Sequence, residues 1–574
     1  MENYISKNRL CSLTTPFEEK GATSWEEVHP APQMMRTAWH SLCGKWQLFV
    51  KTKDGITSLG DIAVPFSPET RMSGMCRQLA KFEQYVYKKT FSLPDNFTEN
   101  NTLLHFGAVD CIAQVFVNGQ FAGEHSGGYT PFTFDITSLL KNGDNTLEVI
   151  VTDSLDKNYP YGKQRKKRGG MWYTPQSGIW QPVWLENVPQ NHIKSIKITP
   201  TLNAVTIKTV GGEQQKTVTL DNGKSYTFCG DSITIEIDNP VCWTPENPQL
   251  YNFTITSGTD SVKSYFALRT VTIEHFGGKP YICLNGKPYF FNGLLDQGYY
   301  SDGLYTPASP DGYIFDIKLA KKSGFNMLRK HIKLEPDIFY YYCDKYGIVV
   351  FQDMINNGGY SFLLDTALPT INIKRGLCRP ASKRRQALFE QTSSELIQSL
   401  YNHPCVCYYT IFNEGWGQHK AKKYYRQFKE SDPTRVWDTA SGWFKTKHTD
   451  VISEHVYFKK VKLKPDYTRP VVLSEFGGYS CKIDGHVFNL DKAYGYKTLG
   501  SKEELSAALL SLYREQIIPA ISKSGLCATV LTQVSDVEDE INGIVTYDRR
   551  VVKIDTDAFY ALWQEISTEF NKSI

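Results

Sequence analysis

The strongest indication of the fold is the stretch Tyr408-Tyr409-Thr410-Ile411-Phe412-Asn413-Glu414-Gly415-Trp416-Gly417. Its aromatic and β-branched first half predicts a buried parallel strand, and the run then stops at an amide, an acid and glycines. In a barrel of parallel strands, the C-terminal ends of the strands carry the chemistry. We therefore expect Glu414 at the mouth of a (β/α)8 barrel. A solvated loop residue or a salt-bridge partner is the alternative interpretation of a glutamate at a strand end.

A second stretch has the same pattern, Pro470-Val471-Val472-Leu473-Ser474-Glu475-Phe476-Gly477-Gly478. Here too an apolar run closes on one glutamate followed by glycines. Two strand-end glutamates predict one shared site at the mouth of the barrel. Facing carboxylates suit glycoside hydrolysis, in which one acid protonates the leaving oxygen and the other stabilises or attacks the sugar carbon.

Strands alternate with amphipathic segments after residues 277–280, which is typical of a parallel α/β sheet. The predicted helices cover residues 313–322, 337–346, 383–400 and 501–522, and Ser501 with Glu504 supplies a capping pattern for the last. We place eight strands at residues 289–294, 325–331, 347–353, 408–414, 434–438, 450–457, 470–475 and 526–533. Eight strands in roughly 290 residues match the size of a (β/α)8 barrel.

Two sets of short alternating strands precede the barrel. Residues 44–50, 85–91 and 113–117, with the hairpin signal Asn118-Gly119, predict an antiparallel β-sandwich. Residues 204–210, 232–237 and 250–255 predict a smaller immunoglobulin-like sandwich without a disulfide. The expected organisation is an N-terminal arm at 1–35, a β-sandwich at 36–188, an immunoglobulin-like β-sandwich at 189–271 and a (β/α)8 TIM barrel at 272–574.

Composition narrows the function classes. A net charge of +4 on 574 residues argues against a chain that coats nucleic acid, and we interpret the basic cluster 163–168 as a solvated loop. The loop that begins the tryptophan-rich segment 169–185 either packs locally or reaches a neighbouring domain. The start of the chain does not resemble a signal peptide, and no stretch is long and apolar enough to span a membrane. The 13 cysteines lie mostly in apolar runs, which is typical of reduced core residues. We expect a cytoplasmic protein that binds neither nucleic acid nor membrane, needs no cofactor, and is a monomer or a homo-oligomer.

Each predicted barrel strand finishes on a polar or charged side chain. These residues are Asn292, Arg329 with His331, Asp353, Asn413 with Glu414, Asp438, Tyr457, Glu475 and Gln533. A ring of hydrogen-bonding groups suits a polyhydroxylated ligand, because each buried hydroxyl must find a partner. The sequence therefore predicts a small carbohydrate or glycoside as the binding partner.

Four stretches in order resemble glycoside hydrolase family two, which contains β-galactosidases, β-glucuronidases and β-mannosidases. They are residues 177–181, 324–329, 412–417 and 474–478. The likeness runs from about Gly44 to the C-terminus, and the family's order of jelly-roll sandwich, immunoglobulin-like sandwich and catalytic barrel agrees with the predicted elements. The resemblance implies a retaining double displacement with Glu414 as the general acid/base and Glu475 as the nucleophile.

The resemblance also implies roles for other residues. Asn413 would hydrogen-bond the sugar 2-hydroxyl, and Tyr457 would orient the nucleophile. Arg329 would keep Glu475 ionised, although a structural barrel salt bridge is the alternative for this arginine. The remaining predicted substrate-binding residues are His331, Asp353, His455, Trp443 and Gln533, with a structural cap as the alternative for Asp353.

The identity of the sugar stays open at this point. No Asn-x-Lys signature of the β-glucuronidases follows Glu475, and Trp416 and Gln418 stand where β-galactosidases carry metal-binding groups, so we predict no required metal. Lys330, Lys333 and the basic cluster 163–168 leave room for a uronic acid, because an anionic sugar needs a fixed cation. The leading hypothesis is an exo-acting, β-galactosidase-like enzyme. A β-galacturonidase or β-glucuronidase and a non-catalytic carbohydrate-binding protein are the alternatives.

Overall fold

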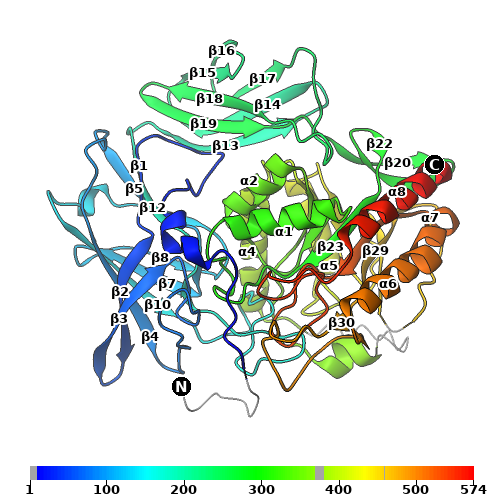
Figure 1. The fold of residues 1–574 in the computed structure, drawn as a ribbon. Helices are drawn as coiled ribbons and strands as arrows, with labels where there is room; N and C mark the ends of the chain where they lie inside the picture. The colour runs from blue at the N-terminus through cyan, green and yellow to red at the C-terminus, as the bar shows by residue number, and fades with distance from the viewer. Residues whose placement is uncertain (1–9, 369–379, 458) are drawn as a thin grey trace.

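The computed structural model describes residues 10–368, 380–457 and 459–574. Figure 1 shows three bodies: an N-terminal sandwich in blue and cyan, a smaller sandwich in green at the top, and a barrel in green to red. An arm that includes short 3-10 turns at Glu18–Lys20 and Ala22–Trp25 precedes the first strand. In this arm, Arg36 pairs with Glu186 of the first sandwich and with Asp260 of the second, so it ties the two sandwiches together.

The N-terminal sandwich packs a six-stranded sheet, of order β3-β2-β4-β10-β7-β8, against a four-stranded sheet, of order β1-β12-β5-β9. Buried and exposed side chains alternate along its strands, as a half-buried sheet requires. Asn118 and Gly119 both have positive φ, which confirms the predicted hairpin turn. The strands are β1 (Trp39–Ser41), β2 (Gly44–Thr52), β3 (Gly55–Val64), β4 (Gln84–Phe91), β5 (Asn101–Phe106), β6 (Val109–Asp110), β7 (Ile112–Val117), β8 (Gln120–Ser126), β9 (Phe132–Asp135), β10 (Asn145–Thr152), β11 (Gly178–Ile179) and β12 (Val183–Val188).

The second sandwich consists of a three-stranded sheet, of order β13-β14-β17, and a four-stranded sheet, of order β16-β15-β18-β19. Its core contains aliphatic and aromatic side chains from both sheets, and the twelve described cysteines of the chain are all free, so no disulfide joins these sheets among the described residues. The strands are β13 (Ile193–Pro200), β14 (Ala204–Gly211), β15 (Gln215–Leu220), β16 (Ser225–Cys229), β17 (Ser232–Glu236), β18 (Tyr251–Ser257) and β19 (Asp260–Phe266).

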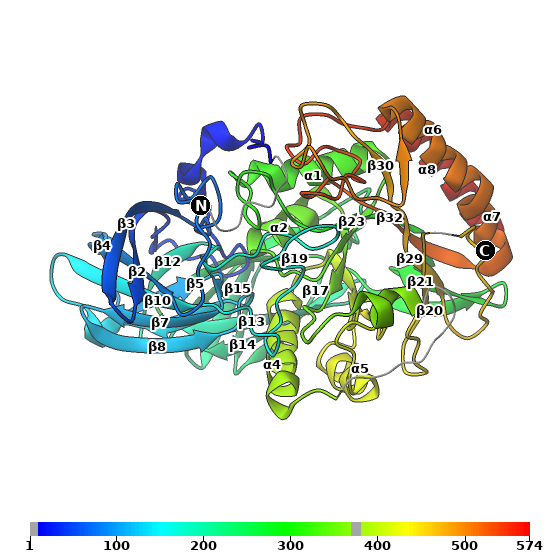
Figure 2. The same ribbon diagram turned by 90° about the horizontal axis from the view of Figure 1, so that it is seen from below.

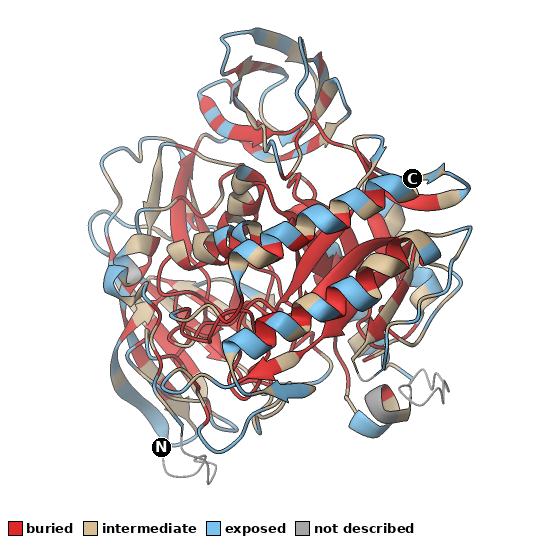
Figure 3. Cartoon of the chain, turned by 45° about the vertical axis from the view of Figure 1, so that its right-hand side comes forward, coloured by how far each residue is buried: buried red, intermediate tan, exposed pale blue. Residues whose placement is uncertain are grey.

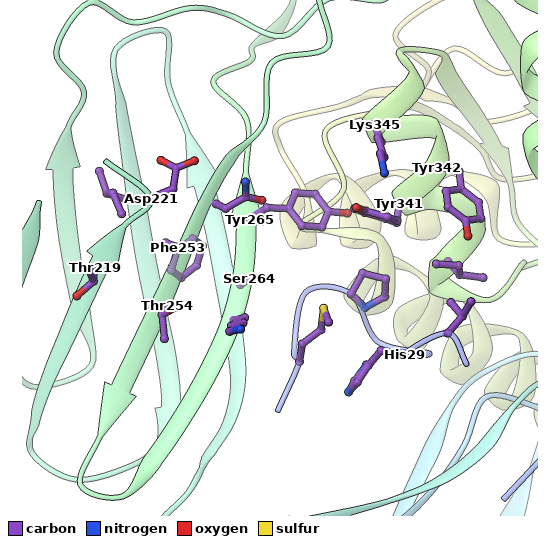
Figure 4. A pocket seen from close by; sticks show the side chains of 17 residues that line it. His29, Thr219, Asp221, Phe253, Thr254, Ser264, Tyr265, Tyr341, Tyr342 and Lys345 are labelled. Carbon is purple, nitrogen blue, oxygen red and sulfur yellow. The ribbon is translucent and has the colours of Figure 1, made fainter. Parts of the chain in front are cut away.

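A cavity of about 510 Å³ lies where the arm, the second sandwich and helix α2 (Asp337–Tyr346) of the barrel meet (Figure 4). Tyr265 reaches across it from the sandwich and donates a hydrogen bond to Asp344 of α2. None of the predicted site residues lines this cavity. It therefore belongs to the junction between the bodies rather than to the predicted site.

The barrel sheet contains eight parallel strands in the order β27-β26-β25-β24-β23-β32-β29-β28, and among the described residues only β27 and β28 lack a partner on one side. This arrangement confirms the predicted barrel. The strands are β23 (Phe291–Asp296), β24 (Met327–Lys330), β25 (Val349–Asp353), β26 (Val406–Thr410), β27 (Val436–Asp438), β28 (Ile452–Val456), β29 (Val471–Gly477) and β32 (Leu526–Thr532). A three-stranded sheet of β20 (Val271–Phe276), β21 (Lys279–Leu284) and β22 (Lys287–Pro288) precedes the barrel, and β30 (Tyr479–Cys481) pairs with β31 (Lys497–Leu499) beside it.

Helices surround the barrel, and α6, α7 and α8 lie together on one side of it (Figures 1 and 2). Figure 3 shows α6 and α8 buried toward the strands and exposed on their outer faces. The Ser501 side chain accepts a hydrogen bond from the Glu504 backbone, which confirms the predicted cap. The helices are α1 (Asp311–Lys322), α2 (Asp337–Tyr346), α4 (Lys383–Leu400), α5 (Ala421–Ser431), α6 (Lys502–Leu512), α7 (Ile518–Ser524) and α8 (Thr556–Ser573), with π-helical turns at Phe362–Ala367 and Tyr513–Ile517. No described helix is both long enough and apolar enough to cross a membrane.

The first barrel strand differs from its predicted position. We expected residues 289–294, whereas β23 runs from Phe291 to Asp296. Asn292 therefore lies near the start of the strand, where it bonds Gly324 and Thr529, and not at the C-terminal end. Asp296 takes that end instead, so the prediction of Asn292 as a strand-end group was wrong.

Candidate active site

The two predicted glutamates lie at the C-terminal end of the barrel. Glu475 belongs to β29, and Glu414 stands in the turn that follows β26. This turn requires glycine at two positions: a Cβ on Gly415 would lie 2.0 Å from the Phe444 ring, and one on Gly417 would lie 2.0 Å from the Asn357 carbonyl oxygen. Glu414 itself adopts a φ of 52°, which non-glycine residues adopt infrequently. The local backbone thus turns sharply at the residue that carries the carboxylate.

The carboxyl groups of Glu414 and Glu475 come within 4.8 Å of each other, oxygen to oxygen. His455 of β28 lies between them, with its Nδ1 atom 2.9 Å from Oε1 of Glu414 and 3.6 Å from Oε2 of Glu475. All three side chains are nearly buried, since Glu414, Glu475 and His455 are 9%, 5% and 7% exposed. The structure therefore brings together the two strand-end glutamates that were predicted to share one site.

Arg329, at the end of β24, connects most of the predicted site. Its Nη1 atom donates to Oε1 of Glu475 at 2.9 Å and to the Ser474 carbonyl, and Nε donates to Asp353 at 3.0 Å. Nη2 donates to Oδ1 of Asn413 at 2.9 Å. A guanidinium with 1% exposure can hold such a position only because two carboxylates neutralise its charge.

Glu475 is held in its ionised form. Burial raises the pKa of this carboxyl, but the charges of His455, Arg329 and His331 and a hydrogen bond from Tyr457 outweigh that effect and lower the pKa to about 2. The Tyr457 hydroxyl donates to Oε2 of Glu475 and also contacts the Thr532 hydroxyl at 2.9 Å. Near neutral pH the site therefore presents one carboxylate with a fixed orientation and a full negative charge.

Asp353 and His331 form a buried pair beside this group, with His331 Nδ1 2.7 Å from Oδ2 of Asp353. Burial raises the pKa of Asp353, but Arg329 and His331 reverse the effect and lower it. Burial is the main cause that lowers the pKa of His331. Asp353 therefore holds both Arg329 and His331 in place. These contacts favour the structural role that was the alternative interpretation of Asp353.

The side-chain orientation of Asn413 is fixed by hydrogen bonds to its amide oxygen. Oδ1 accepts hydrogen bonds from Arg329 and from the Ser441 hydroxyl at 2.9 Å. Its Nδ2 atom has no acceptor among the residues that the structure describes, so both amide protons remain available. Ser441 was not predicted from the sequence, because it lies after β27 in a segment without a motif.

The last two predicted residues make different contacts. Trp443 packs edge-on against His455, with ring centroids 5.5 Å apart, and its indole nitrogen donates to the Asp365 carbonyl. Gln533 is fully buried and donates to Asn542, which in turn donates to Glu540. Trp443 therefore touches the paired glutamates through His455, whereas Gln533 contacts a neighbouring network of amides and acids.

Three consecutive segments of the chain match descriptions of one family. Residues 58–183 match a glycosyl hydrolase 2 galactose-binding domain-like unit, residues 185–269 match glycosyl hydrolases family 2, and residues 279–551 match the TIM barrel domain of that family. The chain belongs to glycoside hydrolase family two. This finding confirms the resemblance that the four motifs indicated and the predicted order of two sandwiches and a barrel.

Curated proteins with similar sequences carry different names. The chain is 27% identical over 380 residues to a β-galactosidase of Thermoanaerobacter pseudethanolicus, a match that covers 60% of this chain and 46% of that protein. It is 28% identical over 357 residues to a putative β-glucuronidase of Formosa agariphila, covering 57% of this chain and 39% of that protein. The chain thus spans less than half the length of these curated relatives.

Solved structures share the fold of this chain. A β-D-glucuronidase from Dictyoglomus thermophilum superposes with a TM-score of 0.72 and 20% identity, covering 93% of this chain and 98% of the other. A β-galacturonidase from Eisenbergiella tayi bound to galacturonate gives a TM-score of 0.68 and 20% identity, covering 93% and 99%. At this identity the likeness concerns the fold alone.

Three side chains of this site offer atoms of the kind that bind metals. Donor atoms of Glu414, His455 and Glu475 all lie within 4.8 Å of one another, a spacing that a metal ion could use. However, Arg329 already donates to Glu475, and its Nη1 atom lies 3.4 Å from Nε2 of His455. A divalent cation would stand beside this guanidinium and be repelled by it. The absence of a required metal therefore remains our prediction.

Two basic residues proposed for an anionic sugar are already engaged. Lys330 pairs with Asp296 at 2.6 Å and with Glu335 at 2.8 Å, and Lys333 pairs with the same Glu335 at 2.8 Å. Both lysines are 1% exposed. Since their charges are neutralised inside the protein, the suggestion that they bind a uronic acid was wrong.

The loop that begins the tryptophan-rich segment 169–185 is a feature whose position the sequence left open. Tyr173 from this loop donates to Glu540 of the barrel, and Trp172 packs edge-on against Trp416 with centroids 5.1 Å apart. The N-terminal sandwich therefore contributes side chains to the end of the barrel where the glutamates lie. The prediction of a solvated loop is therefore wrong for part of the basic cluster, because Lys163 and Gln164 are buried and Arg168 pairs with Asp539, whereas Lys167 is exposed.

Proposed function

We propose that the chain is an exo-acting retaining β-glycosidase, in which Glu475 is the nucleophile and Glu414 the general acid/base. The observation that carries this proposal is the approach of the two carboxyl groups to within 4.8 Å. Retaining glycosidases place these groups about 5–5.5 Å apart, whereas inverting enzymes need about 6.5–9.5 Å to fit a water molecule. The short separation favours direct attack by Glu475 on the sugar.

In the first step of the proposed reaction, the ionised Glu475 attacks the anomeric carbon as the bond to the leaving oxygen breaks. Glu414 gives its proton to that oxygen, so the aglycone departs as a neutral alcohol. In the second step, Glu414 removes a proton from water, and the resulting hydroxide attacks the anomeric carbon. The sugar is released with its β configuration, and Glu475 returns to the carboxylate form.

The surrounding side chains would orient the sugar and the nucleophile. Tyr457 and Arg329 hold the two oxygens of Glu475, which fixes the direction of attack. We assign the free Nδ2 atom of Asn413 to the sugar 2-hydroxyl, where a hydrogen bond gains strength in the transition state. The other proposed sugar-binding residues are His331, His455, Trp443 and Gln533. Asp353 is proposed to position Arg329 and His331, because it contacts both.

The names of relatives leave the sugar between two classes. β-Galactosidases are among the curated relatives and uronidases are among the similar structures. We propose a terminal β-linked hexose of the galactoside type or its uronic acid counterpart. A non-catalytic carbohydrate-binding protein is the second candidate, but such a protein has no need of an ionised glutamate beside a second carboxyl group.

A panel of aryl β-glycosides and the Glu475→Gln variant test this proposal. We expect turnover of at least one glycoside and a fall in kcat of about 10⁴-fold or more in the variant, because the nucleophile is lost. Glu454→Gln is the matched control, since Glu454 lies on β28 but pairs with Lys445 at the surface, and it should keep near-normal rates. An activated 2-fluoro glycoside should label Glu475 covalently.

The carbohydrate-binding alternative predicts a different set of results. Binding of sugars without turnover or labelling would favour it and would refute the enzyme. Near-normal turnover by Glu475→Gln would refute the assignment of the nucleophile, even if the wild-type protein hydrolyses the panel.

A further inference from the structure

Most basic groups near the paired glutamates already have acidic partners. Lys330 and Lys333 pair with Asp296 and Glu335, and Arg168 pairs with Asp539 at 3.1 Å. Lys163 is different. Among the described residues, no carboxylate lies within salt-bridge distance of its ammonium group and no acceptor bonds it, yet the residue is only 9% exposed.

The backbone of the loop places Lys163 beside the barrel end. A Cβ on the preceding residue, Gly162, would lie 3.1 Å from the carbonyl oxygen of Ile332, the residue after His331. The Lys163 carbonyl accepts a hydrogen bond from the Tyr173 backbone, and the Tyr173 hydroxyl donates to Glu540. Lys163 is therefore held between the segment after β24 and the segment after β32.

The side chain of Lys163 lies against the aromatic wall that borders Glu414. Its ammonium group is 5.6 Å from the centre of the Trp172 ring, and Trp172 packs on Trp416, two residues after Glu414. A ring face attracts a cation, but this contact alone does not replace the hydration that burial removes. The ammonium group thus lacks a strong partner in a partly dehydrated place.

Electrostatic coupling agrees with this position. Burial lowers the pKa of His331 and raises the pKa of Glu540, and the charge of Lys163 lowers both. The charge of Glu475 acts on the same two groups. Glu540 does not neutralise Lys163, because its oxygens accept from Tyr173 and Asn542 and lie beyond salt-bridge distance.

We propose that Lys163 binds the carboxylate of a terminal uronic acid, so that the chain prefers β-uronides to neutral β-glycosides. This inference rests on the proposed glycosidase function and names its substrate class. A buried cation without a partner suits an anionic ligand, because the charge-assisted bond forms only when the ligand enters. A neutral hexose offers at that place a hydroxyl, which binds an ammonium group more weakly.

The test compares Lys163→Met with the wild-type protein on four substrates: aryl β-glucuronide, β-galacturonide, β-glucoside and β-galactoside. Methionine keeps the length and apolar stem of the lysine but removes the charge. We expect kcat/KM for the preferred uronide to fall about 10- to 150-fold, as for the loss of a bond to a charged group. Rates on neutral glycosides should stay within about twofold. Lys167→Met is the matched control, because Lys167 lies in the same loop but is exposed, and it should change neither class.

The outcomes separate this inference from the proposed function. A wild-type preference for neutral glycosides, or an equal loss on both substrate classes in Lys163→Met, would overturn the inference and leave the glycosidase function standing. An equal loss would mean that Lys163 only supports Trp172 and the loop. Failure of the wild-type protein to hydrolyse any of the four substrates would refute the proposed function itself.

Discussion

The hydroxyl of Tyr457 offers the sharpest test of how the site controls its nucleophile. Tyr457→Phe removes one oxygen, which donates to Glu475 and contacts Thr532, while the ring can keep its stacking on Tyr496 at a centroid distance of 4.1 Å. A hydrogen bond to a charged group contributes about 1.5–3 kcal/mol. Since about 1.4 kcal/mol is a factor of ten, kcat/KM should fall about 10- to 150-fold.

The pH profile gives an independent readout of the same change. The folded-state pKa of Glu475 is lowered from 4.5 to about 2, so its ionised form is stabilised and is lost only as the pH falls toward 2. Tyr457 is one of the groups that lower this pKa. The acid limb of kcat/KM should therefore move to higher pH in Tyr457→Phe.

The assay is steady-state hydrolysis of the best aryl β-glycoside between pH 2 and pH 8, with unfolding in urea as a check on stability. Tyr513→Phe is the control, because Tyr513 is a buried tyrosine that bonds Asn292 near the opposite end of the barrel. It should leave the pH profile unchanged. An unshifted acid limb together with an unchanged kcat/KM in Tyr457→Phe would refute the reasoning about Glu475.

Two further predictions concern the turn and the arm. Gly415→Ala should lower the free energy of unfolding in urea by about 2–4 kcal/mol, because at a φ of 70° the new Cβ would overlap the Phe444 ring. Gly485→Ala is the control: Gly485 has a φ of 82°, its Cβ would meet nothing within 4 Å, and the loss should be about 1 kcal/mol. Equal losses in the two variants would contradict this prediction. Burial raises the pKa of Glu186, but His105, Arg36 and His29 outweigh this effect and lower the pKa from 4.5 to about 2. The wild-type protein should therefore lose about 3 kcal/mol of unfolding free energy between pH 4.5 and pH 2. Glu186→Gln has no carboxyl group at this position and should not show this loss. Parallel pH curves of the two proteins would contradict this.

The two glutamates could be predicted from the sequence because the signal is local. An apolar run that closes on an acid and glycines marks a strand end, and the glycines of the 408–417 stretch are needed at positive φ beside Phe444 and Asn357. The alternation of strands and helices likewise follows from short-range periodicity. Those patterns were enough for the two sandwiches, the barrel, the strand that Glu414 follows and the strand that carries Glu475.

Register and charge pairing needed the tertiary structure. A shift of two residues in β23 placed Asn292 at the far end of its strand and Asp296 at the site end, and strand periodicity does not distinguish these registers. Arg329 gathers groups from four other strands or loops, and Ser441 has no motif of its own.

The lysines show the physical reason most clearly. Lys330, Lys333 and Lys163 look equally suited to an anion in the sequence, because composition records a charge but not its partner. In the folded protein, Lys330 and Lys333 pair with Asp296 and Glu335, whereas Lys163 lies beside the Trp172 ring without an acidic partner among the described residues. The sequence by itself determined the fold class and the acids that lie at the barrel end. Contacts between residues far apart in the chain decided which cations remain available there, since ion pairing depends on distances in space and not along the chain.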